Sequence, residues 1–389
     1  MQYGNEPWAI AALSDLVSIK TGKLNSNAAV ENGVYPFFTC SRETYKVDTY
    51  SFDCEAVLLA GNNANGVYPI KYYRGRFDAY QRTYVIRSVD ESVLNNRYLF
   101  YALQLELDLL QSLSTGSATK FLTLTILNAL KVRVPRLGDQ NRIVSILGAY
   151  DDLIENNTRR IELLEKMARR LYEEWFVQFR FPGHEDVVLK ESELGVIPEG
   201  WDIQPLYDIA EVTYGHPFKA SQFNEDGVGL GIVRIRDIKA GEIKTYTSEE
   251  GKPRHLIENG DILIGMDGQF HMGKWAGGQA WLVQRVARFR PKQNGRYFLF
   301  LSLERPIKHL ENTIVGTTVA HLSAKDLQEL YVVIPEKAVL DAASAFLEPI
   351  YDLEMKLRRK NANLRTQRDL LLPKLIFGEI DISDIPMPT

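Results

Sequence analysis

The sequence has few cysteines and no long apolar run. Its 389 residues include two cysteines, Cys40 and Cys54. Two are too few for the disulfide framework of a secreted domain, so we expect a reducing, cytoplasmic location. No apolar stretch approaches the roughly 18 residues of a membrane-spanning helix, and the N-terminus lacks the charged-then-apolar pattern of a secretion signal. The composition therefore predicts a globular cytoplasmic protein.

Neither sign of charge dominates the chain. The 46 basic and 50 acidic residues give a net charge of −4, whereas a domain that binds nucleic acid non-specifically is usually basic. Any nucleic-acid binding should therefore depend on a local basic surface or on a partner's positive charge.

Recognisable catalytic motifs are missing. The sequence contains no Gly-x-x-x-x-Gly-Lys-Ser/Thr phosphate loop, no Gly-x-Gly-x-x-Gly fingerprint and no Asn/Asp-Pro-Pro-aromatic tetrapeptide of an amino-methyltransferase. The six histidines have no metal-ligand spacing with the cysteines. Together these absences favour a protein that binds rather than catalyses, and we expect no cofactor or metal on this chain.

What the sequence does contain is an internal repeat. Gly116 and Gly316 each open a polar loop, and Pro135 and Pro335 each end the strand that follows, so both pairs are 200 residues apart. Other matching residues agree within a few positions. Such a duplication predicts a pseudo-two-fold object that carries two related but different sites.

Each repeat is followed by a long segment with heptad spacing, which is typical of a coiled-coil seam. The first segment, from Asp139 to about Val177, has a polar seam position at Asn157 and would form a helix on the order of 55 Å long. The second, from about Lys337 to Leu372, contains Pro349, which should kink or locally break it. The first seam is Ile143, Leu147, Tyr150, Ile154, Asn157, Ile161, Leu164, Ala168, Leu171 and Trp175. The second is Val339, Ala343, Phe346, Ile350, Leu353, Leu357, Lys360, Leu364, Gln367 and Leu371.

These patterns predict an α+β protein with two repeated mixed α/β domains, separated by two long helices that form an antiparallel coiled coil. The predicted domains are residues 1–136 and 181–336, and the predicted helical spacers are residues 137–180 and 337–389. A plain amphipathic helix within a larger bundle is the alternative reading of the first spacer.

Several stretches resemble the specificity subunit of type I restriction-modification systems. They are Pro135–Ile143, Asp151-Asp152, Arg159–Glu165, Glu174–Phe176, Leu194–Trp201 and Leu371–Ile380. In their order and spacing they cover nearly the whole chain. The second helix departs from the pattern at its start, Pro335–Ala338.

The resemblance implies a non-catalytic subunit with two target-recognition domains, each reading one half of a bipartite double-stranded DNA target. Because the two domains differ in sequence, the target should be asymmetric. It also implies two modification (methyltransferase) subunits that bind S-adenosylmethionine, and restriction subunits that translocate DNA with ATP and Mg²⁺. A coiled-coil scaffold whose domains bind protein, and an enzyme with an unrecognised site, are the alternatives. The helix residues expected to bind the partners are Ile143, Leu147, Ile154, Ile161, Leu164, Trp175, Leu353, Leu357, Leu364 and Leu371.

Cationic and amide side chains in the first repeat are candidate DNA contacts. Such groups suit phosphate contact and bidentate reading of bases, by Arg to guanine or by Asn and Gln to adenine. The candidates are Asn62, Asn63, Lys71, Arg74, Arg76, Gln81 and Arg82. An ordinary Asn-Gly turn is the alternative for the amides, and a solvated surface for the cations.

The second repeat has a corresponding set. The loop Asp267–His271 is the counterpart of the Asn62–Asn65 loop, and Arg236 lies at the end of a β-type run. Asp can accept from cytosine and Gln can read adenine. The candidates are Arg234, Arg236, Lys239, Asp267, Gln269, His271 and Arg285. A polar turn or an exposed strand face would explain the same residues.

Two further loops stand at the same place in both repeats, Thr115–Lys120 and Gly316–His321. They are rich in small and hydroxyl residues, which allow a backbone to approach phosphate closely. The candidates are Ser117, Thr119, Lys120, Thr317, Thr318 and His321. A structural turn explains one such loop, and its repetition favours a function in DNA binding.

Overall fold

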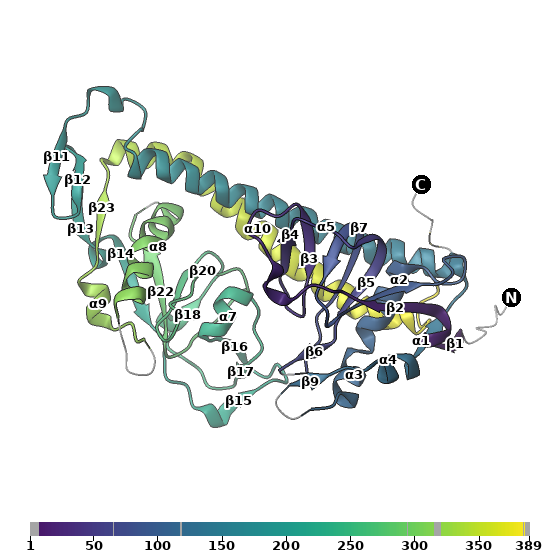
Figure 1. The fold of residues 1–389 in the computed structure, drawn as a ribbon. Helices are drawn as coiled ribbons and strands as arrows, with labels where there is room; N and C mark the ends of the chain where they lie inside the picture. Colours follow the sequence, from purple (N-terminus) through teal and green to yellow (C-terminus); the bar gives the residue numbers. More distant parts are fainter. Residues whose placement is uncertain are drawn as a thin grey trace. The chain divides into compact units, whose positions relative to one another are not determined.

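The protein folds into two compact units, one formed by residues 1–152 and 365–389 (unit 1) and the other by residues 153–364 (unit 2). Each unit holds one copy of the repeat and part of each of two long helices, α5 (Leu137–Tyr172) and α10 (Lys337–Ile376) (Figure 1). The structure, a computed structural model, describes residues 8–64, 66–116, 119–293, 295–314, 320–383 and 385.

Unit 1 is built on a six-stranded sheet in the order β2-β8-β5-β7-β3-β4. Its strands are β2 (Val17–Thr21), β3 (Tyr35–Phe38), β4 (Thr44–Val47), β5 (Phe52–Ala60), β7 (Ile70–Ala79) and β8 (Thr83–Ser88). Strand neighbours are antiparallel except β3 and β7, which are parallel. Successive residues of β5 point to opposite faces, so Val57 and Leu59 enter one core cluster and Ala56 and Leu58 enter another. Apolar side chains therefore cover this strand on both faces.

Helices and short strands complete unit 1. Helix α2 begins after Asn95, whose side chain accepts hydrogen bonds from the backbone of Arg97 and Tyr98 and so caps the helix. The ends of α5 and α10 contribute residues such as Leu147 and Leu375 to the same core. The remaining elements are β1 (Ala9–Ala12), α1 (Leu13–Leu16), η1 (Ser26–Ala28), β6 (Asn62–Asn63), α2 (Asn96–Leu105), α3 (Leu107–Leu113), β9 (Lys120–Phe121), α4 (Leu124–Ala129) and β10 (Lys131–Val134).

Unit 2 has two sheets, a four-stranded one in the order β14-β22-β19-β20 and a five-stranded one in the order β15-β17-β16-β21-β18. The strands are β13 (Asp202–Pro205), β14 (Ala210–Tyr214), β15 (Phe223–Asn224), β16 (Leu230–Val233), β17 (Tyr246–Thr247), β18 (Leu256–Ile257), β19 (Ile262–Gly265), β20 (Met272–Lys274), β21 (Ala280–Leu282), β22 (Val286–Pro291) and β23 (Tyr331–Ile334). The helices are α6 (Leu206–Ile209), η4 (Ala220–Gln222), α7 (Ile235–Ala240), η5 (Pro253–His255), α8 (Arg296–Thr313) and α9 (Ala324–Gln328). Between the repeats lie η2 (Glu173–Val177), η3 (His184–Asp186) and the hairpin β11 (Leu189–Ser192) and β12 (Gly195–Pro198).

The predicted repeat is visible in matching backbone contacts. Strand β1 pairs antiparallel with β10 in unit 1, and β13 pairs in the same way with β23 in unit 2. The residue after the first strand then donates to equivalent carbonyls, Leu13 to Leu130 at 2.7 Å and Leu206 to Leu330 at 2.8 Å. The strand that closes each repeat thus pairs with the strand that opens it.

The two long helices are antiparallel, as the sequence predicts. In unit 2, Asn157 of α5 donates from Nδ2 to Oδ1 of Asn361 in α10 at 2.9 Å. In the same unit, Arg358 of α10 donates to Glu165 of α5 at 2.7 Å. From Asn157 to Glu165 along α5 the contact on α10 moves back from Asn361 to Arg358, so the helices run in opposite directions. The α10 helix passes through Pro349 without interruption, so the predicted local break is absent.

The predicted seam of the second helix is correct at every other position only. Ala343 and Leu357 are buried as expected, but Phe346 is 60% and Leu353 is 37% exposed. The intermediate seam positions lie one residue later, at Leu347, Glu354, Asn361, Arg368 and Leu375. Three of these five residues are polar, so a search for apolar heptads could not find them.

Candidate nucleic-acid interface

Two loops meet at one end of the sheet in unit 1. The residue after β5, Gly61, donates its N–H to the carbonyl of Arg82 at 2.8 Å, and its own carbonyl accepts from Leu122 at 2.9 Å. Strand β6 then pairs with β9, which places Asn62 opposite Phe121. The loop after the buried strand is thereby joined to the loop that precedes α4.

The same framework is present in unit 2. The residue after β19, Met266, donates to the carbonyl of Arg285 at 2.9 Å and accepts from Leu322 at 2.8 Å. An antiparallel bridge places Asp267 opposite His321. Gly61 thus corresponds to Met266, Arg82 to Arg285, Asn62 to Asp267 and Phe121 to His321. We call each framework a loop pair.

The side chains of the two loop pairs differ in chemistry. In unit 1 the Arg82 guanidinium lies 5.4 Å from the centre of the Phe121 ring. In unit 2, Arg285 Nη1 lies 2.6 Å from His321 Nε2, and its Nε lies 3.5 Å from Asp267 Oδ2. His321 Nδ1 is hydrogen-bonded to Asp267. Three predicted residues, far apart in the sequence, therefore form one exposed polar group.

The neutral form of His321 explains the hydrogen bonds of this group. A guanidinium only donates, so His321 Nε2 must accept from Arg285. The ring proton is then on Nδ1, which donates to the carboxylate of Asp267. The backbone of Arg285 has a φ of 74°. This value lies in the left-handed region, which residues other than glycine rarely adopt. The loop pair thus holds this arginine in an unusual backbone conformation.

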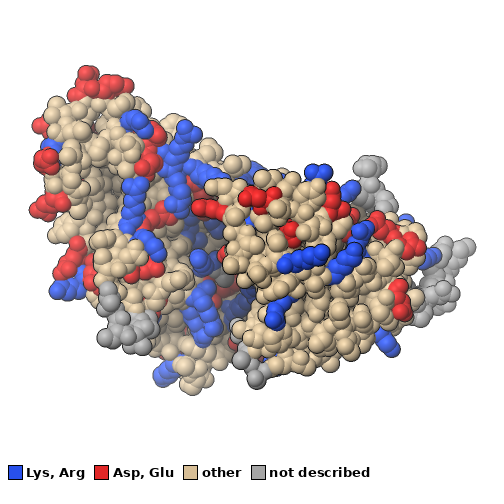
Figure 2. Space-filling model, viewed as in Figure 1, with Lys and Arg blue, Asp and Glu red and all other residues tan. Residues whose placement is uncertain are grey.

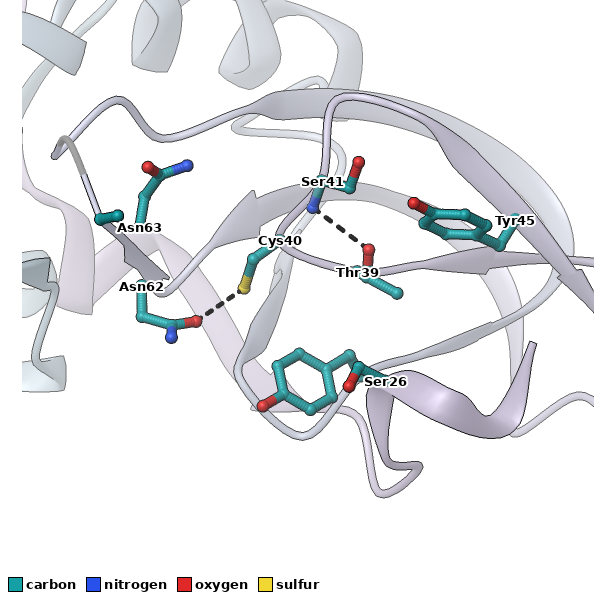
Figure 3. Close-up of a pocket in the computed structure, with 9 residues that line it drawn as sticks. Ser26, Thr39, Cys40, Ser41, Tyr45, Asn62 and Asn63 are labelled. Atoms are coloured by element: carbon teal, nitrogen blue, oxygen red, sulfur yellow. Dashed lines mark hydrogen bonds between the residues drawn. The ribbon is translucent and has the colours of Figure 1, made fainter. Parts of the chain in front are cut away.

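A polar concavity of about 380 Å³ adjoins the loop pair of unit 1. The Cys40 thiol donates to Asn62 Oδ1 at 2.9 Å and lies 3.4 Å from the Arg82 carbonyl oxygen (Figure 3). Ser41 donates its backbone N–H to Thr39 Oγ1 at 3.1 Å. The lining residues are Ser26, Thr39, Cys40, Ser41, Tyr45, Asn62, Asn63, Ala64 and Tyr80. Hydroxyl and amide groups of this kind match the donors and acceptors of base edges and phosphates.

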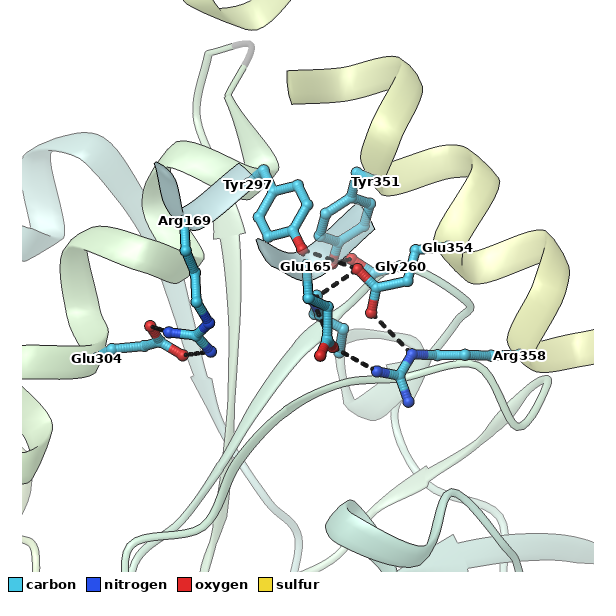
Figure 4. Close-up of polar contacts among 9 residues, drawn as sticks. Glu165, Arg169, Gly260, Tyr297, Glu304, Tyr351, Glu354 and Arg358 are labelled. Atoms are coloured by element: carbon cyan, nitrogen blue, oxygen red, sulfur yellow. Dashed lines mark hydrogen bonds and ion pairs between the residues drawn. The ribbon is translucent and has the colours of Figure 1, made fainter. Parts of the chain in front are cut away.

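A buried ion cluster fixes β20 and α8 on the long helices in unit 2. Lys274 Nζ lies 2.7 Å from Glu354, 3.4 Å from Glu165 and 3.0 Å from the hydroxyl of Tyr297. Arg358 bridges both carboxylates, at 2.8 Å from Glu354 and 2.7 Å from Glu165. Figure 4 shows the side chains of Glu165, Tyr297, Glu354 and Arg358 pointing toward one another. Lys274 is 4% and Glu354 is 0% exposed.

Burial and charge oppose each other in this cluster. Burial lowers the pKa of Lys274, and the nearby Glu354 carboxylate counteracts that shift. Burial raises the pKa of Glu165, but Lys274 and Arg358 outweigh it and the net shift is downward. Such a cluster is costly to break, because removing one partner leaves a buried charge unpaired.

Unit 1 has a smaller counterpart of this cluster. The hydroxyl of Tyr101 in α2 donates to Asp151 at 2.5 Å, and Arg97 lies 2.8 Å from Asp152. In unit 2 the equivalent Arg296 of α8 lies 2.7 Å from Asp352. In both units, therefore, an arginine at the start of the domain helix pairs with an aspartate on a long helix.

The comparisons with known proteins agree with the repeated framework. The family model described as "Type I restriction modification DNA specificity domain" matches residues 5–166 and again residues 198–363. The chain belongs to this family. The match confirms both the predicted resemblance and the duplication, and the named relatives are specificity subunits, the non-catalytic class that the sequence predicts.

Several specificity subunits are similar over much of their length. The MjaVIII specificity subunit of Methanocaldococcus jannaschii is 24% identical over 98% of this chain and 94% of its own. The MjaIX subunit of the same organism is also 24% identical, over 75% of this chain and 70% of its own. An S subunit structure from M. genitalium covers 96% of this chain and 98% of its own, with a TM-score of 0.62 and 16% identity, and so shares the fold.

The structure brings together those predicted DNA-contact residues that lie in the loop pairs. Asn62 and Asn63 pair with Phe121 and Lys120 in unit 1. Gln81 is exposed next to Arg82. Gly116, at the start of the second loop, has φ of 115°, and a Cβ there would meet the Thr119 carbonyl oxygen at 2.0 Å. Ser117, Thr317 and Thr318 lie outside the described residues.

Two strand cations of unit 1, Lys71 and Arg76, have partners within the chain. Lys71 donates to the Glu43 carbonyl at 2.6 Å, and burial lowers the pKa of Lys71 to about 8. Arg76 lies 3.0 Å from Asp53, and Arg74 is exposed. A role of these residues in DNA binding stays a prediction.

The first cations of unit 2 surround α7. Arg234 lies over the ring of Phe223 at 5.1 Å, and its N–H is bonded to Asp237. Arg236 and Lys239 are exposed on α7, so Arg236 belongs to a helix and the predicted β run ends before it. Gln269 is exposed in the turn after Asp267, and the carbonyl of His271 accepts from Gly265 at 2.8 Å.

The predicted partner-binding residues of the long helices differ in how far they are exposed to solvent. Ile143, Leu147, Ile161 and Leu357 are buried within the chain, and Ile154, Leu164, Trp175, Leu364 and Leu371 are half-buried. The exposed large apolar residues of the long helices are Leu153, Leu163, Met167, Phe346, Leu353 and Leu370. Binding of partners by the helices stays a prediction, and these exposed residues are the ones that offer apolar surface.

Sequence reasoning missed Thr39, Cys40 and Ser41 in the concavity of unit 1, and it did not predict the ion cluster of unit 2. The charged members of the cluster come from segments that are distant in the sequence. Within the described part of the chain, no three His, Cys, Asp or Glu residues form a metal-binding group. No helix there has the length and hydropathy of a membrane span. Figure 2 shows acidic and basic side chains interspersed on the visible face.

Proposed function

We propose that this chain selects an asymmetric bipartite DNA target for a type I restriction-modification complex, with one half-site read by each unit. The observation that carries the proposal is the loop pair, which has one backbone framework and two sets of side chains. Equivalent frameworks would present equivalent positions to DNA, and the differences between Asn62 and Asp267 and between Phe121 and His321 would give the two units different sequence preferences.

The chemistry of the loop pairs suits base reading in the major groove. An arginine fork matches O6 and N7 of guanine, an asparagine amide matches adenine, and an aspartate accepts from the amino group of cytosine. The glycine at 116 lets the backbone approach closely, which suits phosphate contact. Both kinds of contact are required, because phosphate contacts position a protein and base contacts specify the sequence.

Two modification subunits and, in the full complex, restriction subunits are the proposed partners. The exposed apolar side chains of Leu163 and Met167 lie four residues apart on α5, 58% and 57% exposed, and so share one helix face. A net charge of −4 means that much of the phosphate contact would fall to the partners. S-adenosylmethionine, ATP and Mg²⁺ would bind to those partners, and the complex would act in the cytoplasm.

The test is genomic adenine methylation, measured by long-read sequencing in cells that contain this chain and its methyltransferase subunit. Cells that lack only this chain are the control. The proposal expects a methylated bipartite motif with a fixed spacer that disappears in the control. If purified chain plus methyltransferase binds no duplex and methylates no motif, the repeated domains bind protein instead.

A further inference from the structure

We propose that Arg82 and Arg285 are equivalent base-reading residues, and that each selects a guanine in the half-site of its own unit. The inference rests on the proposed function and names the residue and the base at the centre of each loop pair. It goes beyond the sequence, in which nothing distinguishes these two arginines from the other cations of their repeats.

The backbone hydrogen bonds of the two arginines are equivalent, although Arg285 alone has a left-handed φ. Arg82 is the residue before β8 and Arg285 is the residue before β22. Each carbonyl accepts from the residue that follows the adjacent buried strand, at 2.8 Å from Gly61 and at 2.9 Å from Met266. Both side chains are exposed. Each arginine therefore occupies the same position, next to both loops of its pair.

Each guanidinium is also held by the second loop, although the means differ. Arg82 lies over the ring of Phe121, and Arg285 donates to the imidazole of His321. Phe121 and His321 are themselves equivalent residues. Two unlike side chains that restrain the same arginine indicate that the orientation of the guanidinium matters, and not only its charge.

Orientation matters for base reading more than for phosphate binding. A guanine presents two acceptors, O6 and N7, that need a planar fork at a fixed angle. In unit 2 the Nε of Arg285 faces Asp267 and one Nη1 proton is used by His321. The outward donors of the two terminal nitrogens are left for a base. In unit 1 the Arg82 guanidinium lies 5.4 Å from the centre of the Phe121 ring, and such a cation–π contact does not itself use the N–H donors that a base would accept from.

The experiment compares Arg82→Gln and Arg285→Gln in the complex with the methyltransferase subunit. Methylation motifs are mapped by long-read sequencing. Binding is then measured by competition, on duplexes that carry each base at each position of the wild-type motif. We expect Arg82→Gln to relax one guanine position in one half, and Arg285→Gln to relax one in the other half. The loss of discrimination at that position should be roughly 5- to 150-fold.

Matched controls carry the same charge change on exposed arginines of the same units. Arg87→Gln alters the far end of β8, and Arg305→Gln alters α8, where Arg305 pairs with Glu173. Neither control should change the motif. Unfolding midpoints of all four variants establish that the fold is retained.

Three results would overturn the inference while leaving the proposed function intact. One is a wild-type motif unchanged by both arginine variants. Another is an affinity that falls equally on all sequences, with a salt slope reduced by about one, the signature of a phosphate contact. The third is that both variants relax the same half. A wild-type complex without any bipartite motif would instead remove the proposed function, and this inference with it.

A further variant tests whether Asp267 acts through Arg285. Asp267→Ala should relax the same base position as Arg285→Gln, but less strongly. The double variant should be no worse than Arg285→Gln alone, since a positioning residue has nothing left to position. Additive effects, or an effect of Asp267→Ala at a different base, would mean that Asp267 contacts DNA independently.

Discussion

Asn157 and Asn361 face each other across the helix pair of unit 2, joined by a 2.9 Å hydrogen bond and exposed by only 3% and 2%. Asn361 also donates to the Ile154 carbonyl and lies 3.2 Å from the hydroxyl of Thr158. A buried amide pair satisfies its hydrogen bonds in one helix register only. This pair therefore specifies how α5 and α10 align, at some cost in stability.

Replacing one member of the pair should be worse than replacing both. In Asn361→Leu the buried amide of Asn157 is left without this partner, and we expect a loss of about 1–3 kcal/mol in the free energy of unfolding. The double change of Asn157 and Asn361 to leucine should recover much of that loss, because two apolar groups then meet. Urea denaturation of the wild type, both single variants and the double variant gives the coupling energy. Losses that simply add would show that the pair is not coupled.

The ion cluster predicts a larger effect from a single substitution. Lys274→Met leaves Glu354, which is 0% exposed, and Glu165 with Arg358 as their remaining cation. Breaking a buried pair in this way costs about 3–5 kcal/mol, measurable as the change in the denaturant midpoint. Arg305→Gln, which removes an exposed pair with Glu173, should change stability by about 0.5 kcal/mol at most. Equal effects of the two substitutions would contradict the burial argument.

These two helix features show what the sequence could and could not reveal. Asn157 was predictable, because it is one polar residue among apolar heptad positions of α5. Glu354 and Asn361 were not, because polar residues that alternate with apolar ones look like an exposed face. Only the three-dimensional structure shows that Lys274, on a strand 80 residues earlier, makes burial of Glu354 possible. The apolar half of the α10 seam was found, and the polar half was assigned one residue too early.

The loop pairs, too, were predictable from the sequence only in part. The repeat led to Asn62, Asp267 and His321 as candidates, because matching loops recur in both halves of the chain, whereas Arg285 was a candidate as a cation on a predicted strand. Their contacts depend on a bridge between segments some 54 residues apart in sequence, which no local pattern encodes. Thr39 and its neighbours were missed, since a short polar stretch after β3 gives no periodic signal.

The half-buried lysine of unit 1 predicts a pH dependence at alkaline pH. Burial lowers the pKa of Lys71 from 10.5 to about 8. Between these values the unfolded chain binds more protons than the folded one, so folding stability should rise as pH increases from 8 to 10.5. Below pH 8 both states are protonated and this contribution stays constant. The free energy of unfolding of the wild type should therefore increase relative to Lys71→Met across this window. A constant difference would mean that the ammonium is fully solvated.

Exchange of one recognition domain should change one half of the DNA target. Replacing residues 1–136 with the same region of another family member leaves the loop pair around Asp267 and His321 in place. Methylome sequencing should then report a new first half joined to the unchanged second half. The reciprocal exchange of residues 181–336 is the control and should change the other half. If either exchange alters both halves, the units do not read independently.

The exposed apolar face of α5 should bind a methyltransferase subunit. Leu163 and Met167 are more than half exposed and lie one turn apart on the helix. Exposed apolar side chains that share one face are typical of an interaction surface. Changing both to glutamate should leave the unfolding midpoint within error, while reducing co-purification of the methyltransferase at least tenfold, since two charges would be buried in the interface. Leu189→Glu, on the 53% exposed leucine of β11, carries the same kind of change on a different surface and should not affect binding. If the double variant captures the methyltransferase subunit normally, the docking site lies on another face of the helices.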